Sequence, residues 1–539
     1  MTFNFSKSKF VAAWSHCNKY AWLDKNKPNE KAEPSEFTES LFDNGHKVGE
    51  LAKQYFNIDV DVTVLREDGS PNTYEMVEET RKHLLLGTKV IAEASFDYNG
   101  FFCSVDILVR NNDNTYNIYE VKSSKRDLKN EKKYDGVKDK YVIDAAYQQY
   151  VLENCGHKIN KVFVVLLSEI YERGKDLELD KYFVCCDVTK YTMLLQNEVK
   201  NKLAEIGVIL GDANEPTTVF TKNCKDCDYF NYCASAMSKP SIFDLYDIKF
   251  GELCEIYNDG ILFGDIPRIE KKLNEISSRN KTKRKEPRKL GLATRNQIEY
   301  YNRPNDVYID KMQIKNFLDS LKFPLYSLDF ETYQAIVPEY EGMITSEMIP
   351  FQYSLHIMKV PNGDYSEGSP DLDEKHFIDI SGGDPRRAIA ESLVRDIPFG
   401  ASIIACHEST ERNIIKRLAE LFPDLSAHLL SFGYKNEKGE NRYLDPQPLF
   451  KKGYYYSSKM KNSFSLKSIL PALYPNDADM DYHNLEGSVK NGTQAMTAIL
   501  KARTLTGAEL EQIKKDLVEY CALDTYAVVK IIKKLYEVI

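Results

Sequence analysis

The stretch KVIAEASFDYNGFFCSVDILVRNNDNTYNIYEVKSSK, residues 89–125, predicts three consecutive strands separated by turns at YNG and NNDN. Asp106 falls on the second of these strands, and Glu120 and Lys122 fall on the third. Because residues two apart on a strand face the same side, Glu120 and Lys122 converge on one point, which Asp106 can join. Two carboxylates can hold Mg²⁺ or Mn²⁺, and a neighbouring lysine can orient or deprotonate a water molecule. The stretch therefore predicts a sheet with a metal-dependent catalytic group on one face.

Length and composition limit the class of protein. The chain has 539 residues, too many for a single core, so we expect at least two domains. Its 42% hydrophobic and 28% charged residues match those of globular proteins. No apolar run approaches the ~18 residues of a membrane span, and the N-terminal MTFNFSKSKF has no apolar signal core. We therefore expect a cytoplasmic protein with no membrane partner, whose thiols are kept reduced.

The sequence falls into three zones. Residues 1–240 mix helical and strand patterns and end in a cysteine cluster, residues 241–320 are helical and polar, and residues 321–539 open with the strand-like FPLYSLDF and close with a long periodic helix. The middle zone contains the charge run KTKRKEPRK at 281–289, which fits either a basic solvated linker or a surface that contacts phosphates. The net charge of −9 argues against nucleic-acid binding over the whole surface, but not against a local basic groove.

Three cysteines fall within NCKDCDYFNYC, residues 223–233, with the spacing C-x2-C-x5-C. In a reducing compartment such clustering indicates metal binding or catalysis more often than a disulfide. A zinc knuckle would bring a second C-x-x-C or a histidine pair, and none follows nearby. A fourth ligand must therefore come from elsewhere, and Cys17 in AAWSHCNKYAWL is the best candidate. Zinc and unligated thiols both remain open interpretations.

One distant cysteine followed by C-x2-C-x5-C resembles the iron–sulfur nucleases of the CRISPR-associated Cas-four type and the AddB-type helicase–nucleases. In those proteins the cluster ties the ends of the nuclease domain together. The resemblance implies a [4Fe–4S] cluster held by four cysteines, namely Cys17, Cys224, Cys227 and Cys233. It also implies a nuclease signature between Cys17 and Cys224.

The D-x13-E-x-K spacing of Asp106, Glu120 and Lys122 resembles that signature, which belongs to the PD-(D/E)xK nucleases. Val105 stands where the eponymous proline would be. The resemblance implies a restriction-endonuclease-like α/β domain over residues 1–240, with Asp106 and Glu120 as Mg²⁺ or Mn²⁺ ligands and Lys122 as a catalytic residue.

Two accessory positions follow from the resemblance to RecB-type nucleases. DAAYQQYVL at 144–152 resembles their helix with a glutamine and a tyrosine near the site, which selects Gln148 and Tyr150, although a polar helix face gives the same pattern. These nucleases usually have a metal-binding histidine in G-x-x-[VI]-H, but NGHKVGELA places Gly49 there. His46 lies nearly one helical turn earlier and could partly substitute; otherwise this ligand is lost, which bears on how many metal ions the site holds.

A second catalytic motif is YSLDFET at 326–332, where Asp329 and Glu331 lie two apart on a predicted strand and share one face. It resembles the D-x-E motif that begins the RNase H-like DEDD exonucleases. Their tyrosine subclass ends in Y-x3-D on a late helix, and VEYCALDTYAVV supplies Tyr520 and Asp524 on one helical face. The resemblance implies that Asp329, Glu331 and Asp524 hold metal and that Tyr520 positions the attacking water.

The middle motif of this class is an aspartate within a helix. The matching segment is IIACHESTERNIIKRLAELF at 403–422, where the acid in register is Glu411 and Glu408 is the alternative. After it, YYYSSKMKNSFSLKSILPALYP at 454–475 interleaves aromatic residues with Lys459, Lys461 and Lys467. This stretch could stack bases and contact phosphates, or form a partly ordered surface loop.

The two domains in this order resemble bacterial fusions of a Cas-four-like or RecB-like iron–sulfur nuclease with a DnaQ-like exonuclease. The resemblance covers roughly residues 1–240 and 322–539 and implies a two-site, metal-dependent nuclease that trims DNA single strands, flaps or ends, with a 3′→5′ C-terminal site. It places the protein in DNA repair, antiviral defence or CRISPR spacer capture, with CRISPR or defence-system proteins as partners. The alternatives are a non-catalytic nucleic-acid-binding protein whose sites have decayed, and an exonuclease directed at RNA.

Overall fold

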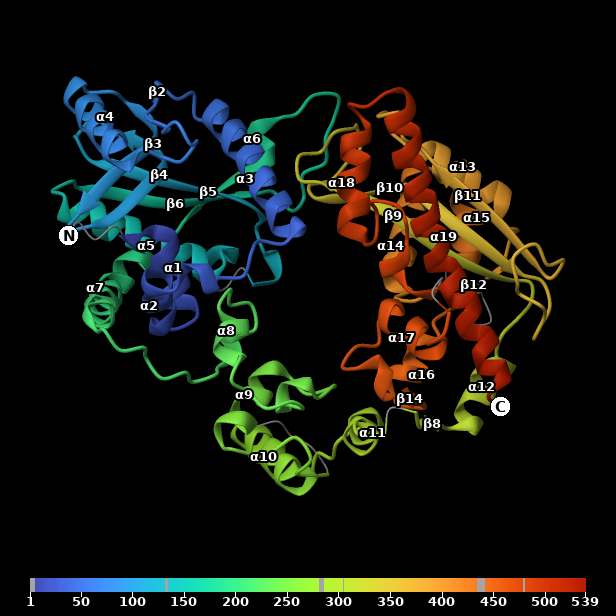
Figure 1. The fold of residues 1–539 in the computed structure, drawn as a ribbon. Coiled ribbons are helices and arrows are strands. Elements are labelled where there is room, and N and C mark those ends of the chain that lie inside the picture. The colour runs from blue at the N-terminus through green and yellow to red at the C-terminus, as the bar shows by residue number, and fades with distance from the viewer. Residues whose placement is uncertain (1–4, 131–133, 281–285, 304, 434–441, 478–479) are drawn as a thin grey trace. The chain divides into compact units, whose positions relative to one another are not determined.

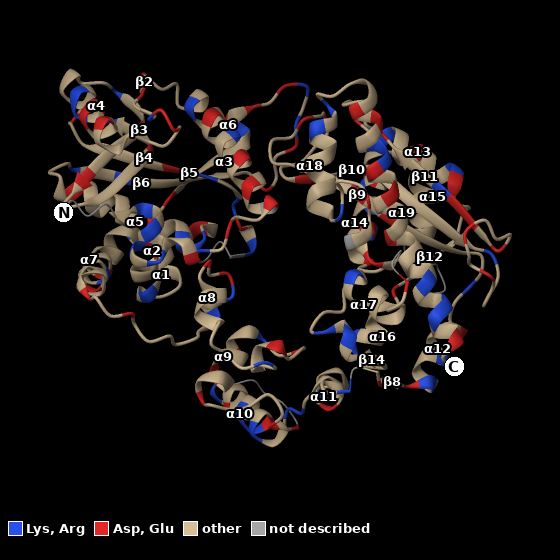
Figure 2. Cartoon of the chain, viewed as in Figure 1, with Lys and Arg blue, Asp and Glu red and all other residues tan. Residues whose placement is uncertain are grey.

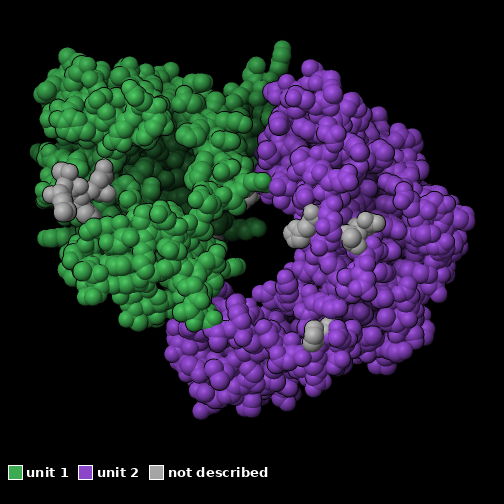
Figure 3. Space-filling view, viewed as in Figure 1, with its two compact units in different colours: residues 1–237, 335–347 green, residues 238–334, 348–539 purple. Residues whose placement is uncertain are grey.

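The computed structural model describes residues 5–130, 134–280, 286–303, 305–433, 442–477 and 480–539. The chain is a mixed α/β protein that divides into two compact units (Figures 1 and 3). Unit 1 comprises Met1–Met237 and Ala335–Glu347, and unit 2 comprises Ser238–Gln334 and Met348–Ile539. Each unit has its own sheet and its own hydrophobic core. None of the described helices combines the length and the apolarity that crossing a bilayer requires.

Seven strands form the sheet of unit 1, in the order β2-β3-β4-β5-β6-β7 with β1 beside β4. Their bounds are β1 Phe5–Ser6, β2 Val60–Asp61, β3 Val90–Tyr98, β4 Phe101–Arg110, β5 Tyr116–Lys125, β6 Ile159–Leu167 and β7 Phe183–Asp187. Strands β3, β4 and β5 form an antiparallel meander, which confirms the three strands predicted from residues 89–125, and β6 joins parallel to β5. Asn99 and Gly100 both have positive φ, the backbone that a tight two-residue hairpin needs.

Helices cover both faces of this sheet (Figure 1). They are α1 Lys7–Ser15, α2 Asn18–Asn26, α3 Glu36–Tyr55, α4 Thr73–Leu86, α5 Asp139–Asn154, α6 Leu179–Tyr182, α7 Thr189–Gly211 and α8 Phe230–Ala234. Ile118 of β5 lies in the core built with α1, α5 and α7, whereas Tyr119 and Val121 lie in the core built with α3. Because side chains alternate along a strand, Glu120 and Lys122 share the face of Ile118 and point toward α1 and α5.

Five strands form the main sheet of unit 2, in the order β11-β10-β9-β12-β13. Their bounds are β9 Leu325–Ala335, β10 Glu347–Met358, β11 Leu372–Ile378, β12 Ser402–Ile404 and β13 Tyr443–Leu444. Strands β10 and β11 are antiparallel, and β12 runs parallel to both β9 and β13. A separate antiparallel pair joins β8 Val307–Ile309 to β14 Tyr455–Ser457.

The helices of unit 2 also cover both faces of its sheet. They are α9 Phe250–Asn258, α10 Ile266–Arg279, α11 Leu292–Tyr300, α12 Lys311–Asp319, α13 Arg386–Asp396, α14 Ser409–Leu421, α15 Pro423–Gly433, α16 Gln447–Lys451, α17 Leu466–Leu473, α18 Gly492–Ala502 and α19 Gly507–Glu537. Leu328 and Phe330 of β9 lie in the core with α13, α14 and α15. By alternation Asp329 and Glu331 face the opposite side, where Ser327 Oγ donates to the carbonyl of Thr525 on α19 at 2.9 Å.

The middle zone is not a separate linker. Residues 241–320, predicted as a helical linker, belong to unit 2, and only residues 1–237 of the predicted 1–240 belong to unit 1. The reason is burial: Ile314 and Leu318, four residues apart on α12, lie in the same core as Val528 and Leu535 of α19. Residues 281–285 of the charge run lie outside the described residues, so its contact with phosphates stays a prediction.

One segment of the predicted domain 321–539 belongs to unit 1 instead of unit 2. Residues 335–347, which connect β9 to β10, pack in unit 1. There Tyr182 Oη donates to the carbonyl of Ile336 at 3.0 Å, and Arg173 Nη1 donates to the carbonyl of Pro338 at 2.7 Å. The backbone of this connection is therefore satisfied by unit 1.

Candidate functional sites

The first site lies on the face of the unit 1 sheet that α1 and α5 cover. Lys122 Nζ donates to Glu120 Oε1 at 2.5 Å, and the Val121 N–H donates to Asp106 Oδ2 at 2.7 Å. The register of β4 and β5 places Asp106 opposite Glu120. The structure thus brings together Asp106, Glu120 and Lys122, the three residues that the D-x13-E-x-K spacing selects.

Two residues that the sequence analysis did not select join this group. Lys7, the first residue of α1, places Nζ 3.0 Å from Glu120 Oε1 and 3.4 Å from Asp106 Oδ1. Asp144 of α5 accepts from Lys122 Nζ at 2.8 Å. Asp144 had a sequence signal, since it precedes the selected Gln148 by one helical turn. Lys7 had none, because the sequence does not show that β1 runs beside β4 and brings α1 to the acids.

Charges of both signs set the ionisation of this group. Burial raises the pKa of Glu120 to about 7, and the charges of Asp106 and Asp144 add to this effect. Burial alone would lower the pKa of Lys122, but Asp144 and Glu120 raise it above its ordinary value. Burial would likewise raise the pKa of Asp144, but Lys122 and Lys7 hold it well below its usual range. Lys122 therefore stays protonated beside an ionised Asp144.

Of the three accessory residues selected from the sequence, the structure brings Gln148 to the acids of the first site. Gln148 is fully buried, and its Nε2 donates to Glu120 Oε2 at 2.7 Å and to Asp144 Oδ1 at 3.0 Å. Tyr150 lies on another face of α5, with its ring packed edge-on against Tyr98 at 6.4 Å. His46 is exposed on α3, whereas the acids are largely buried, so the structure does not bring His46 into the group. The aromatic ring near this site belongs instead to Tyr141, 5.5 Å from Lys122 Nζ.

All four cysteines, Cys17, Cys224, Cys227 and Cys233, line one cavity of ≈ 220 Å³ in unit 1. Cys17 lies between α1 and α2, Cys224 ends the short 3-10 helix Lys222–Cys224, and Cys233 lies on α8. Two hydrogen bonds hold helix α2 near the cysteine segment. Tyr20 Oη donates to Asp228 Oδ2 at 3.0 Å, and Trp22 Nε1 donates to the carbonyl of Asp212, which follows α7, at 2.9 Å. The structure therefore brings the distant Cys17 to the C-x2-C-x5-C segment.

The separation of the sulfurs tests which centre they fit. A tetrahedral zinc ion with bonds of about 2.3 Å would bring its sulfurs to roughly 3.8 Å from one another. Among the described residues, no three of these four sulfurs lie within 4.8 Å of one another. Burial raises the pKa of Cys227 to about 12, and the charges of the other three cysteines add to this, so a metal ion would have to displace its proton. The sulfurs are therefore not gathered at the distances of a single tetrahedral zinc site.

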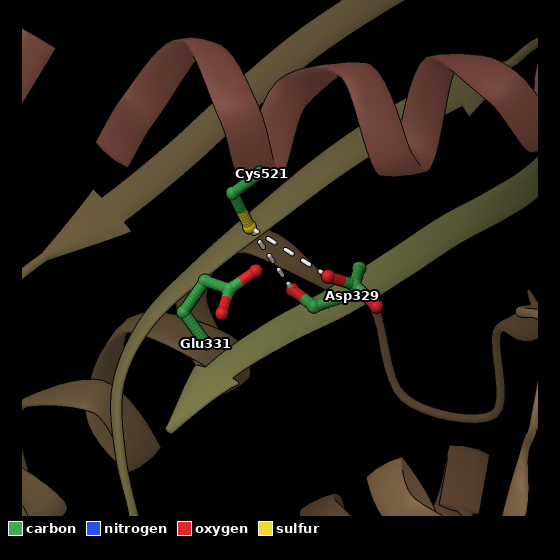
Figure 4. A group of neighbouring side chains, drawn as sticks. All are labelled: Asp329, Glu331 and Cys521. Atoms are coloured by element: carbon green, nitrogen blue, oxygen red, sulfur yellow. Dashed lines mark hydrogen bonds between the residues drawn. The ribbon is translucent and has the colours of Figure 1, made fainter. Parts of the chain in front are cut away.

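The second site lies between β9 and α19 in unit 2. Ligand atoms of Asp329, Glu331 and Cys521 all lie within 4.8 Å of one another. Figure 4 shows the two acids projecting from the strand and Cys521 projecting from the helix toward Asp329. Cys521 Sγ lies 3.9 Å from Asp329 Oδ2. Cys521 was not selected from the sequence, although it directly follows the selected Tyr520.

Asp524 lies in this site with two tyrosines and a lysine. Tyr482 Oη donates to Asp524 Oδ1 at 2.6 Å, and Tyr520 also forms a hydrogen bond with Asp524. Lys467 Nζ lies 5.2 Å from the ring centroid of Tyr482 and 5.3 Å from that of Tyr520. Tyr482 lies outside every motif, so no local signal could have selected it.

Two tyrosines of the stretch 454–475 are buried. Tyr455 and Tyr456 form strand β14 and are 3% and 1% exposed, so neither ring is open to stack on a base. Lys467, by contrast, lies near the acids: burial lowers its pKa, and the charges of Asp524 and Glu331 oppose this effect.

Glu411, rather than Glu408, faces the other acids. It lies in the first turn of α14, is 5% exposed, and its Oε2 has no hydrogen-bond partner among the described residues. Glu408 Oε2 likewise has no hydrogen-bond partner among the described residues, but its side chain is 33% exposed and lies 3.1 Å from Arg412 Nη2 in an ion pair. Burial raises the pKa of Asp329 well above its usual range, with Asp524, Glu331 and Glu411 adding to the shift.

The remaining acids behave in the same way. Burial raises the pKa values of Glu331 and Asp524, and it raises that of Glu411 to about 8 with a contribution from Asp445. A buried carboxylate oxygen without a donor is costly unless a cation or a proton reaches it. Oxygen ligands of this kind suit Mg²⁺ or Mn²⁺, so the acids of unit 2 fit a divalent-cation site.

Residues 326–465 match the family model of a domain of unknown function (DUF2779). The match includes Asp329, Glu331 and Glu411 and ends before Tyr520 and Asp524. Neither the search of curated proteins nor that of solved structures found a match to the chain.

Proposed function

We propose that this chain is a two-site, metal-dependent nuclease that trims DNA, with a 3′→5′ exonuclease site in unit 2 and a second nuclease site in unit 1. The observation that carries the proposal is the acid group of unit 2. Asp329 and Glu331 lie together on a strand, and the charges of Asp524 and Glu411, from two helices, add to the raised pKa of the buried Asp329. Two divalent cations in polynucleotide-cleaving enzymes require this kind of dense carboxylate group and no covalent nucleophile.

The topology of each unit supports the proposal. In unit 2, three sequential strands are extended by two parallel strands on the free edge of the first, β9, which favours an RNase H-like domain. In unit 1, a three-strand meander followed by α5 and the parallel strand β6 favours a restriction-endonuclease-like domain. In both units two acids lie on central strands, and the helices that they face supply further acids and polar groups.

The residues of unit 2 have separable roles in the proposed reaction. Bound Mg²⁺ or Mn²⁺ would activate water and stabilise the charge that develops on the phosphate. Tyr482 and Tyr520 hold the Asp524 carboxylate through hydrogen bonds. The Lys467 ammonium lies over both rings and places a positive charge beside the acids.

In unit 1, the Lys122 ammonium is held by Glu120 and Asp144 and can stabilise the charge that develops on a phosphate. We assign the four cysteines to a [4Fe–4S] cluster, which would cross-link α2 to the segment 222–234. The ≈ 220 Å³ cavity and the wide sulfur separation support this assignment.

The test is cleavage of end-labelled single-stranded DNA, double-stranded DNA and RNA with Mg²⁺ or Mn²⁺, with 5′ and 3′ labels compared. We expect 3′-labelled DNA to release mononucleotides first and 5′-labelled DNA to shorten progressively. The double variant Glu120→Gln, Asp524→Asn is the control for contaminating nucleases. Cleavage of RNA alone would make the enzyme RNA-directed, and equal rates for parent and double variant would contradict the proposal.

A further inference from the structure

Glu93 has a backbone conformation that is rare within a strand. It lies in β3 with φ +56, in the left-handed region. For a residue other than glycine this region is costly, and it persists where the surrounding structure imposes it. The effect of the distortion is local, because the residues on either side of Glu93 keep their pairing with β4.

The register of the meander aligns Glu93 with the acids of the first site. The neighbours of Glu93 pair with the neighbours of Asp106, so these two residues stand opposite each other. The register of β4 and β5 places Asp106 opposite Glu120 in the same way. Opposite residues of antiparallel strands project from the same face. Glu93, Asp106 and Glu120 therefore form one row across three adjacent strands, with ligand oxygens that do not all lie within 4.8 Å of one another.

A second observation concerns Gln148, whose amide group contacts this row. Gln148 is fully buried, and both of the hydrogen bonds recorded for it are donated by Nε2, one of them to Glu120. Its Oε1 is buried without a hydrogen-bond partner among the described residues. An amide oxygen without a donor is costly in a protein interior, and it is a ligand type that hard cations accept.

We propose that Glu93 is the third carboxylate ligand of a divalent cation held by Asp106 and Glu120, and that it takes the place of the histidine absent at Gly49. This inference rests on the function proposed for unit 1. The charges agree with one cation: two lysines, Lys7 and Lys122, face four carboxylates, which leaves a deficit of two positive charges when all are ionised. The carboxylates are Glu93, Asp106, Glu120 and Asp144.

The electrostatics of Glu93 agree with this geometry. Burial raises the pKa of Glu93 to about 8, and the charge of Asp106 adds to the effect, while Lys7 opposes it. Glu93 therefore lies close enough to the other acids to feel their charge.

Mn²⁺ binding to the full chain tests the inference. The parent for this test has the substitutions Asp329→Asn and Asp524→Asn, which disable the site of unit 2, and free Mn²⁺ is measured by electron paramagnetic resonance during titration. We expect Glu93→Gln to weaken Mn²⁺ binding at least ~10-fold, as Asp106→Asn should. Glu67→Gln, at an exposed position of the same unit, is the matched control and should leave the affinity unchanged.

The variant Glu93→Gly separates a ligand from a structural residue. Glycine tolerates the left-handed φ of this position, so Glu93→Gly should unfold at the same or a higher temperature while losing the same Mn²⁺ affinity. If Asp106→Asn weakens binding but both Glu93 variants bind within about twofold of the parent, Glu93 is not a ligand. If Asp106→Asn also leaves the affinity unchanged, unit 1 does not hold the cation, and the function proposed for that unit fails with it.

Discussion

In unit 1, the ammonium groups of Lys7 and Lys122 lie within 3.4 Å of the buried acids. In unit 2, no lysine or arginine in the described part of the chain forms an ion pair with any of the four acids, Asp329, Glu331, Glu411 and Asp524. The consequence differs between individual acids of the two sites. The pKa of Asp144 in unit 1 falls because of its lysines although burial raises that of Glu120, whereas those of Asp329 and Glu331 in unit 2 both rise.

This difference indicates how the negative charge of the acids is neutralised in each site. Unit 1 pairs two lysines with its acids, so part of their negative charge is already neutralised. Unit 2 has no such ion pair among its described residues, so we expect protons or metal ions to stabilise its buried acids. We therefore expect metal ions to stabilise unit 2 more than unit 1, and we expect substitution of Asp144 in unit 1 and of Glu411 in unit 2 to act with opposite sign.

The largest effect we expect is the separate loss of two activities. Asp329→Ala should lower 3′→5′ degradation at least ~10³-fold and spare cleavage by unit 1, while Lys122→Ala should do the reverse. Each change removes a group from one unit, and distant sites usually behave independently. The measurement is cleavage of singly end-labelled strands. Loss of both activities in either single variant would show that the two acid groups act as one site.

The next largest effect concerns a feature of unit 1 that unit 2 lacks. Anaerobically purified protein should be brown, with a broad absorbance shoulder near ~400 nm, as cysteine-bound iron–sulfur centres show. Cys17→Ala should remove the colour and lower the unfolding temperature of unit 1, because cluster binding is coupled to folding. Cys254→Ala, at a buried position of unit 2, is the control and should stay brown. A colourless protein with one tightly bound zinc ion would contradict the cluster assignment.

The comparison predicts that removing an acid from unit 2 stabilises the metal-free protein. The pKa of Glu411 is raised to about 8, so its native state holds a proton more tightly than its unfolded state. The stability from this group is fully present below about pH 4 and is lost as the pH rises through about 8. Glu411→Gln should therefore raise the metal-free stability by on the order of 3 kcal/mol at pH 8, with little effect at pH 4. Urea unfolding at both values measures the difference, and saturating Mn²⁺ should reverse the order of the two proteins.

The matched change in unit 1 should destabilise the protein. Asp144 has a lowered pKa, so its contribution is present above its ordinary value near 4 and is lost as the pH falls through its folded value. Asp144→Asn leaves Lys122 with a weaker partner and should cost about 2 kcal/mol at pH 7. The same urea unfolding experiment measures it. Stabilisation by Asp144→Asn at pH 7 would overturn the contrast between the two sites.

The smallest effect we expect is that of Tyr482→Phe. It removes one of the two hydrogen bonds from tyrosine to Asp524 and leaves the ring in place. We expect about a tenfold lower kcat for 3′→5′ degradation with a nearly unchanged KM, since each lost hydrogen bond to a charged group is worth roughly 1.5 kcal/mol or more. Tyr474→Phe, whose hydroxyl donates to the Lys530 carbonyl away from the acids, is the control. Equal losses in the two variants would mean that Tyr482 acts through the fold alone.

Local spacing was enough to select several members of both sites. Glu120 and Lys122 are two apart on a strand, Asp329 and Glu331 repeat this spacing, and Asp524 follows Tyr520 by one helical turn. Glu93 had a signal too, since the tight turn at Asn99–Gly100 sets the register that places it opposite Asp106. The periodicity of one element fixes the face on which each side chain lies, so the sequence determined these sets and the strands that hold them.

Tertiary packing decided which elements meet. Lys7 reaches Glu120 because β1 pairs with β4, and Tyr482 reaches Asp524 from the short 3-10 helix Tyr482–Asn484. Packing also turned Tyr150 toward Tyr98, left His46 exposed and buried the predicted linker against α19. Contacts between elements depend on how their buried faces fit together, and periodicity within one element contains no information about its partner. The sequence therefore determined which residues share a face, and the tertiary structure decided which faces became sites.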